Sequence, residues 1–233
     1  MNLMTLLEDK TKQRYQGQQG RHYHESKRSV PDQAFPWVAR LRAEKISPHV
    51  TREETVFEYG VGFGWNLAQL RCRRRLGSDV AEFLEPVIRE QGIEFVADPN
   101  TVAEGSMDVV ICHHVLEHAL HPPEMLTAIH RLLRQGGKLL LFVPYEKERR
   151  FRTYNPVEPN HHLYSWNVQT LGRLVAETGF EVREARIGRF GQERFAAVWA
   201  ARLSLGETGF RLLRFIANRL KNEVEVQVVA MKP

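Results

Sequence analysis

The sequence predicts an α/β fold in which helices cover both faces of a parallel sheet. Short β-prone runs alternate along the chain with segments of helical character, the pattern of strands joined by crossover helices. Glycine or proline closes several of these segments, as expected where a chain leaves a helix or a sheet. The 233 residues are 42% hydrophobic and 26% charged, a composition typical of a globular protein with a sizeable core.

Seven segments have the composition of strands. They are residues 55–59, 77–80, 93–97, 108–112, 138–143, 180–187 and 223–231. Helices are expected at residues 36–46, 66–74, 86–91, 123–134, 166–178 and 212–221. We expect a single domain with a helical lead-in at 1–50, a ligand-binding core at 51–190, an inserted helical segment at 191–222 and a last strand at 223–233.

Composition excludes several classes of protein. The two cysteines, Cys72 and Cys112, are too few for a disulfide framework or a four-cysteine zinc site. The first residues lack a basic stretch followed by an apolar one, and no apolar run approaches the roughly 20 residues of a membrane span. The net charge of +5 is modest. These features favour a cytoplasmic protein.

A glycine-rich loop follows the first predicted strand. Gly60, Gly62 and Gly64 alternate with larger residues, including Val61, so the backbone can approach a ligand closely. A dinucleotide fingerprint needs its third glycine at position 65, where the chain has Trp65. The spacing is therefore poor for a pyrophosphate and better suited to a ligand with an adenosine and an amino-acid tail.

Two further residues extend this predicted ligand site. A helix is expected to begin near Asn66, so its amide N–H groups would face the same ligand. Asp79 lies nineteen residues after Gly60 (79 − 60), close to the spacing of about 20 for an acid that binds ribose hydroxyls. Together they indicate a nucleoside-binding pocket.

These motifs resemble the class I S-adenosylmethionine-dependent methyltransferases, and most closely those that act on small molecules, quinone precursors, sugars and lipid-linked intermediates. The likeness extends from about residue 56 to residue 233. Its motifs are residues 58–64, 77–80, 107–111 with 115–118, 132–139, 162–171 with 179–182, and 228–233. Each is weak alone, but their order along the chain is specific.

The resemblance implies a Rossmann-like three-layer sandwich with seven strands, the last antiparallel, and S-adenosyl-L-methionine as cofactor. It places the methionine part of the cofactor among Glu58, Gly60, Gly62 and Gly64. It assigns the ribose to Asp79, the adenine ring to Val80, and the methionine amino end to Cys112 and His113. Asp98 is the candidate for the adenine amino group, although the turn-forming Pro99 and Asn100 follow it.

Histidines supply the candidates for a general base, because imidazole accepts protons near neutral pH. His162 ranks first and His114 second, and hydrogen bonding within a loop is the alternative for both. The spacing of His114 and His118 is compatible with a shared helix face. We nevertheless expect no metal, because the segment 115–118 matches the family pattern without one and gives Glu117 and His118 a structural role.

The acceptor is expected to be a small or carrier-linked metabolite, such as a sugar, a lipid-linked molecule or an aromatic compound, methylated on oxygen or nitrogen. Residues 15–28 are candidates for a lid. Residues 195–221 contain a basic amphipathic stretch, which suits packing on the sheet, a homodimer contact or a peripheral membrane contact. Nucleic acid is not expected as a partner. The alternatives are a nucleic-acid methyltransferase and a non-catalytic cofactor-binding subunit.

Overall fold

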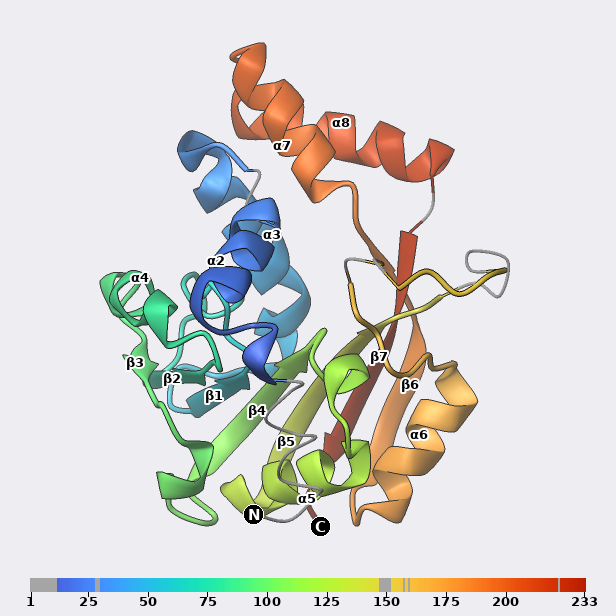
Figure 1. Ribbon diagram of the computed structural model, residues 1–233. Helices are drawn as coiled ribbons and strands as arrows, with labels where there is room; N and C mark the ends of the chain where they lie inside the picture. Colours follow the sequence, from blue (N-terminus) through green and yellow to red (C-terminus); the bar gives the residue numbers. More distant parts are fainter. Residues whose placement is uncertain (1–11, 28–29, 147–151, 157, 159, 222) are drawn as a thin grey trace.

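The computed structural model describes residues 12–27, 30–146, 152–156, 158, 160–221 and 223–233. One seven-stranded sheet forms the centre of the molecule (Figure 1), with the strand order β3-β2-β1-β4-β5-β7-β6. The strands are β1 (Thr55–Tyr59), β2 (Arg74–Ser78), β3 (Glu94–Phe95), β4 (Met107–His113), β5 (Leu133–Pro144), β6 (Glu181–Phe190) and β7 (Glu223–Met231). Strands β1 to β5 pair in parallel, whereas β7 runs antiparallel to both β5 and β6. The predicted fold class is confirmed.

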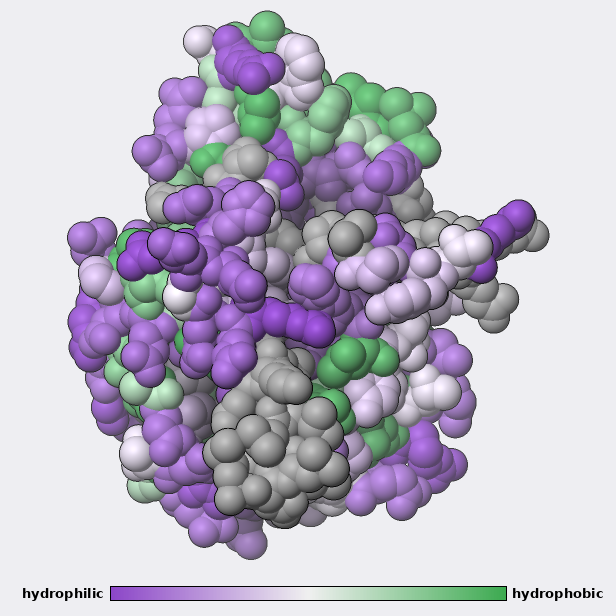
Figure 2. All heavy atoms as spheres, viewed as in Figure 1, coloured by the Kyte–Doolittle hydropathy of each residue, from purple (hydrophilic) through white to green (hydrophobic). Residues whose placement is uncertain are grey.

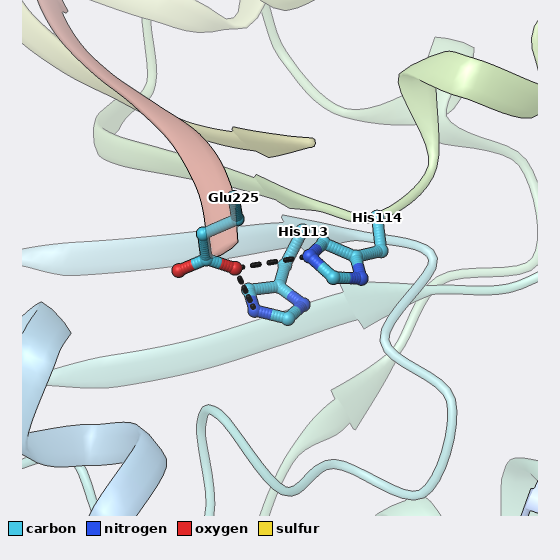
Figure 3. Close-up of side chains that lie close together, drawn as sticks. All are labelled: His113, His114 and Glu225. Carbon is cyan, nitrogen blue, oxygen red and sulfur yellow. Dashed lines mark hydrogen bonds and ion pairs between the residues drawn. The ribbon is translucent and has the colours of Figure 1, made fainter. Parts of the chain in front are cut away.

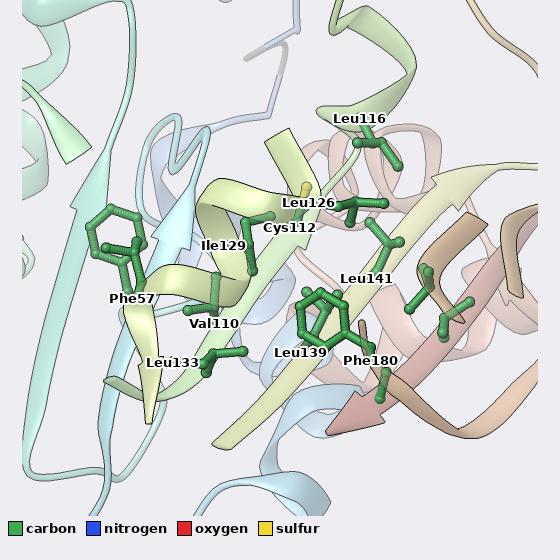
Figure 4. Packing of buried hydrophobic residues seen from close by; sticks show 14 of the residues in the cluster. Phe57, Val110, Cys112, Leu116, Leu126, Ile129, Leu133, Leu139, Leu141 and Phe180 are labelled. Carbon is green, nitrogen blue, oxygen red and sulfur yellow. The ribbon is translucent and has the colours of Figure 1, made fainter. Parts of the chain in front are cut away.

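The two faces of the sheet bury different helices because side chains alternate along each strand. Val110 and Cys112 of β4 pack with α5 (Pro122–Leu132) and α6 (Val168–Glu177), as the cluster in Figure 4 shows. Val109 and Ile111 point to the other face, where α3 (Phe35–Ile46) and α4 (Glu85–Glu90) lie. The result is the expected three-layer arrangement.

The helix expected at residues 66–74 is wrong. Residues 64–70 form consecutive turns, and β2 already begins at Arg74. The segment between Gly64 and that strand is short, and Arg75 of β2 takes up its carbonyl groups: Arg75 Nη1 donates to Ala68 O at 2.9 Å. In a longer helix, backbone N–H groups of the next turn would bind these carbonyl groups. Here the guanidinium group of Arg75 binds them instead.

Two helices stand apart from the sheet, α7 (Glu193–Arg202) and α8 (Gly206–Leu220). They form a hairpin beside α3 at the top of the molecule in Figure 1. Phe210 of α8 is fully buried against Trp37, and Arg40 of α3 forms an ion pair with Glu207 at 2.6 Å. These contacts hold one side of the hairpin against the lead-in. Among the residues described, no helix has the length and apolar character to cross a bilayer.

Candidate active site

A cavity of about 1340 Å³ opens at the carboxyl ends of β1, β2 and β4, the place where ligands bind in open α/β sheets. Most of the residues predicted from sequence line it: Gly60, Val61, Gly62, Asn66, Asp79, Val80, Asp98, His113, His114 and His162. Three do not, because Glu58, Gly64 and Cys112 lie behind the wall. Of these, Glu58 and Cys112 are fully buried.

The glycine loop has the backbone that its sequence requires. Gly60, Gly62 and Gly64 have φ of +65°, +52° and +79°, in the left-handed region that favours glycine. A Cβ on Gly60 would lie 2.3 Å from Val115 Cγ2, and one on Gly64 would lie 2.6 Å from Ile93 Cδ1. A Cβ on Gly62 would meet nothing within 4 Å. The space beside Gly62 is therefore open, so a ligand in the cavity can approach the backbone there.

Asp79 ties this loop to the end of β2. Its Oδ2 accepts a hydrogen bond from the Gly62 amide at 2.8 Å, and its Oδ1 accepts one from the Ala81 amide at 2.9 Å. Each carboxylate oxygen has a second lone pair. The side chain can thus brace the loop and still accept hydrogen bonds from ligand hydroxyls.

Glu58 and Asn66 form a buried polar pair beneath the loop. Asn66 Nδ2 donates to Glu58 Oε1, and burial, partly offset by this bond, raises the pKa of Glu58 to about 8. In the described part of the chain, Asn66 Oδ1 and Glu58 Oε2 have no hydrogen-bond partner. An unsatisfied buried acceptor is costly, and Asn66 lines the cavity, so its Oδ1 suits a ligand that brings N–H donors.

The remaining predicted cofactor residues differ in their surroundings. Val80 is half-exposed at the cavity and can offer an apolar surface to a ring. Asp98 accepts hydrogen bonds from the backbone and side-chain nitrogens of Asn100, so it also closes the turn that follows it. Burial raises the pKa of the Cys112 thiol, and this side chain belongs to the core rather than to the cavity.

One cluster of charged groups lies where β4 ends (Figure 3). Glu225 of β7 is fully buried and accepts from Lys45 Nζ at 2.8 Å. His114 Nε2 lies 2.9 Å from Glu225 Oε2, and His113 Nε2 lies 2.7 Å from Lys45 Nζ. Gln227 Nε2 also donates to Glu225 Oε1. Neither Lys45 nor Glu225 was among the site residues predicted from the sequence.

The pKa values in this cluster follow from burial and from the neighbouring charges. Burial would raise the pKa of Glu225, but the hydrogen bond from His114 and the charge of Lys45 lower it to about 2. Burial, and then Lys45, lower the pKa of His113 well below its ordinary value. Burial also lowers the pKa of His114, against the effect of Glu225. The two imidazoles are therefore neutral at pH 7, beside the ion pair of Lys45 and Glu225; burial lowers the pKa of Lys45, and Glu225 opposes that effect.

A second histidine cluster lies in the same cavity. His162 Nδ1 lies 2.9 Å from Glu146 Oε1, and its Nε2 lies 3.9 Å from Glu117 Oε1. His118 packs edge-on against His162 with ring centroids 4.9 Å apart, and its Nδ1 lies 3.0 Å from the Tyr15 hydroxyl. Glu146 and Tyr15 are contacts that sequence spacing did not reveal.

Both clusters contain donor atoms of the kinds that bind metals, with three such atoms within 4.8 Å of one another in each. The first group, His113, His114 and Glu225, already has the Lys45 ammonium beside it, which would repel a cation. In the second group, Glu117 and the Nε2 atoms of His118 and His162 face one another. The expectation of no metal remains a prediction, to be tested by chelation.

The helix α2 (Gly17–Lys27) brings the lead-in over the cavity. Tyr15, Tyr23 and His24 line it, and burial raises the pKa of Tyr15 to about 12. Arg21 lies over the ring of Phe83, 4.7 Å from its centroid. Residues of this segment therefore line the site, and the lid role expected of residues 15–28 remains a prediction.

Comparisons with known proteins identify the family of this chain. A family model described as a methyltransferase domain matches residues 26–185, more than half of the chain. A probable S-adenosylmethionine-dependent methyltransferase of Mycolicibacterium smegmatis is 25% identical over 181 residues, covering 66% of this chain and 70% of the relative.

Solved structures share the fold. Phosphoethanolamine N-methyltransferase 2 of Haemonchus contortus, in complex with S-adenosyl-L-methionine, superposes with a TM-score of 0.56 at 19% identity. The match covers 84% of this chain but only 52% of the nematode enzyme, so this chain spans about half of its length. The [4+2]-cyclase SpnF gives a TM-score of 0.58 at 17% identity, covering 85% of this chain and 80% of the cyclase. Likeness at this level shows the fold alone. The family match shows more: the chain belongs to the methyltransferase-domain family, has the class I fold and uses S-adenosyl-L-methionine as its cofactor.

Proposed function

We propose that this protein transfers the methyl group to an oxygen or nitrogen atom of a small or carrier-linked metabolite, with His162 as the general base. The observation that carries the proposal is the position of His162. It lines the same cavity as the glycine loop, and a carboxylate holds its other ring nitrogen. The acceptor classes we favour are sugars, lipid-linked molecules and aromatic compounds.

The cofactor half of the cavity is assigned to the loop and its neighbours. Asp79 binds the ribose hydroxyls, Val80 lies against the adenine, and Asn66 Oδ1 accepts from the amino end of the methionine part. Backbone groups of Gly60 and Gly62 approach that part most closely. Bound there, the cofactor supplies an electrophilic methyl group on a sulfonium, so the protein's main task is to align the acceptor with it and exclude water.

His162 is oriented for proton removal. When Nδ1–H donates to Glu146, the lone pair is on Nε2, and the carboxylate stabilises the imidazolium that forms. Among the described residues, the nearest carboxylate to Nε2 is Glu117, at 3.9 Å. This distance exceeds that of a hydrogen bond, so Nε2 is available to an acceptor hydroxyl or ammonium group.

The test measures cofactor affinity and turnover separately. Calorimetry with S-adenosylmethionine reports binding, and formation of S-adenosylhomocysteine reports turnover with a phenol, a primary amine and a nucleotide sugar as trial acceptors. His162→Ala should keep the cofactor affinity and lower turnover about 100-fold, the usual size of a general-base contribution. Glu146→Gln should lower turnover less, because Nε2 keeps its lone pair.

The matched control is His22→Ala, since His22 is exposed on α2. Full turnover in His162→Ala would show that His162 is not the general base. Loss of turnover in EDTA, restored by Mg²⁺ or Mn²⁺, would instead assign Glu117, His118 and His162 to a metal site. Methylation of RNA alone would favour the nucleic-acid alternative, and binding without any turnover would favour a non-catalytic subunit.

A further inference from the structure

The hairpin of α7 and α8 exposes large hydrophobic side chains on both helices. On each helix these side chains recur every three or four residues, so they lie along one face of it. We call this exposed apolar surface of both helices the stripe. The exposed set is Phe195, Trp199, Leu203 and Leu205 on and after α7, and Leu212, Phe215, Ile216 and Leu220 on α8. Figure 2 shows such side chains gathered at the upper right, over α8.

Packing among the described residues does not explain the stripe. The other side of α8 contributes the packed residues Phe210 and Ala217, and the ion pair of Arg211 with Glu44 of α3 ties the helix to the lead-in. Leu220 is 85% exposed and Leu212 is 58% exposed. Exposed apolar surface of this extent marks an interaction site.

Positive charge surrounds the stripe. Residues 191–221 contain six arginines and lysines against two glutamates. Glu193 pairs with Arg42 and Glu207 with Arg40 of α3, while Arg211 pairs with Glu44 and Lys221 with Glu223, so Arg202 and Arg219 are the cations that matter most at the stripe. Arg202 and Arg219 are exposed among the apolar side chains, and their guanidinium groups lie near the rings of Trp199 and Phe215. Apolar side chains flanked by cations suit the headgroup region of an anionic bilayer.

The stripe is continuous with the active-site cavity. Phe195, the first hydrophobic residue of the α7 stripe, also lines that cavity, together with Phe190 and Arg194 before it. Lys221, at the far end of α8, lines the cavity as well. A surface bound through the hairpin would therefore lie beside the mouth of the site.

From these observations we infer that the α7–α8 hairpin docks on an anionic membrane surface and presents the cavity to it. Resting on the proposed function, this selects the lipid-linked class among the acceptors, because such a molecule would reach the cavity from the bilayer along Phe195. The docking itself needs neither cofactor nor acceptor, so it is testable separately from methyl transfer.

The first experiment is sedimentation of the full chain with phosphatidylcholine vesicles, with and without phosphatidylglycerol. We expect binding to the anionic vesicles, at least tenfold weaker binding to neutral ones, and weakening by salt. Phe215→Ser combined with Leu220→Ser should lower vesicle affinity at least tenfold without changing thermal unfolding or cofactor affinity. Arg219→Ser should weaken it several-fold, whereas the matched control Arg173→Ser on α6 should leave it unchanged.

The second experiment uses Trp199, the exposed member of the four tryptophans. Vesicles with brominated acyl chains should quench its fluorescence, and Trp199→Phe should abolish that quenching while sedimentation persists. No sedimentation with either vesicle would overturn the inference, as would binding that the Phe215 and Leu220 changes leave intact. A dimer in light scattering that these changes dissociate, without vesicle binding, would assign the stripe to a second copy of the chain.

Discussion

Lys45→Met tests the charged cluster at the end of β4. In the native protein Lys45 Nζ lies 2.8 Å from Glu225 Oε1 and 4.4 Å from the ring centroid of Phe142. Glu225 is fully buried, and removing one partner of a buried ion pair costs roughly 3–5 kcal/mol. Gln227 and His114 remain bonded to the carboxylate. We therefore expect a loss at the lower end, about 3 kcal/mol at pH 8.

The pH dependence identifies the cause of that loss. Without Lys45, protonation of His114 restores a positive charge beside Glu225, which raises the pKa of His114 from its lowered native value. A histidine whose folded pKa rises above its unfolded value of about 6.5 stabilises the protein below that pH, and the contribution disappears as pH rises through the folded pKa. The variant's deficit should therefore be smaller at pH 5.5 than at pH 8.

Urea unfolding at the two pH values measures the deficit, and Lys45→Met/Glu225→Gln provides the rescue. The double variant removes the uncompensated charge, so it should recover most of the loss at pH 8. Arg89→Met is the matched control, because the exposed Arg89–Glu85 pair should contribute less than about 1 kcal/mol. A deficit below about 1 kcal/mol at pH 8, or one that is equal at both pH values, would refute the reasoning.

Three other changes test the cofactor side and the hairpin. Asp79→Ala should weaken S-adenosylmethionine binding by about 1–3 kcal/mol, a 5- to 150-fold rise in Kd by calorimetry; an unchanged Kd would separate Asp79 from the ribose. Gly60→Ala should unfold at much lower urea than Gly62→Ala, because only the first meets Val115, whereas Gly62→Ala should bind cofactor poorly while remaining folded. Phe210→Ala should cost about 3–5 kcal/mol of unfolding free energy, and a native-like urea midpoint would show that α8 is not anchored there.

Most strands were predictable because they include short β-prone runs that end at glycine, proline or polar residues. The bounds predicted for the first and last strands, residues 55–59 and 223–231, agree with β1 and β7. The second and third strands were harder to define: β2 begins at Arg74 in a run of arginines, and β3 has only two residues. The helix expected at residues 66–74 failed because its carbonyl groups are bound by Arg75, a tertiary contact that helical periodicity does not report.

The missed site residues share a topological cause. Glu225 lies near the start of β7, and β7 is antiparallel, so its beginning lies where β4 and β5 end: Glu225 pairs with Pro144. Reasoning from the carboxyl ends of parallel strands places no residue of the last strand at the site. A signal was present, since Glu225 and Gln227 alternate with valines in a strand that must be buried on both faces. Two polar side chains on one face of such a strand require partners.

The two predicted bases differ in what surrounds them, and this difference decides between them. A proton on His114 would lie in the cluster that already contains the Lys45 ammonium, and burial and that charge favour the neutral imidazole. His114 also has φ of +55°, a conformation that asparagine tolerates better than most residues. His114→Asn therefore removes the imidazole while sparing the backbone. It should lower turnover less than about tenfold, against about 100-fold for His162→Ala. The reverse order would make His114 the base and give Glu225, through their hydrogen bond, the positioning role assigned here to Glu146.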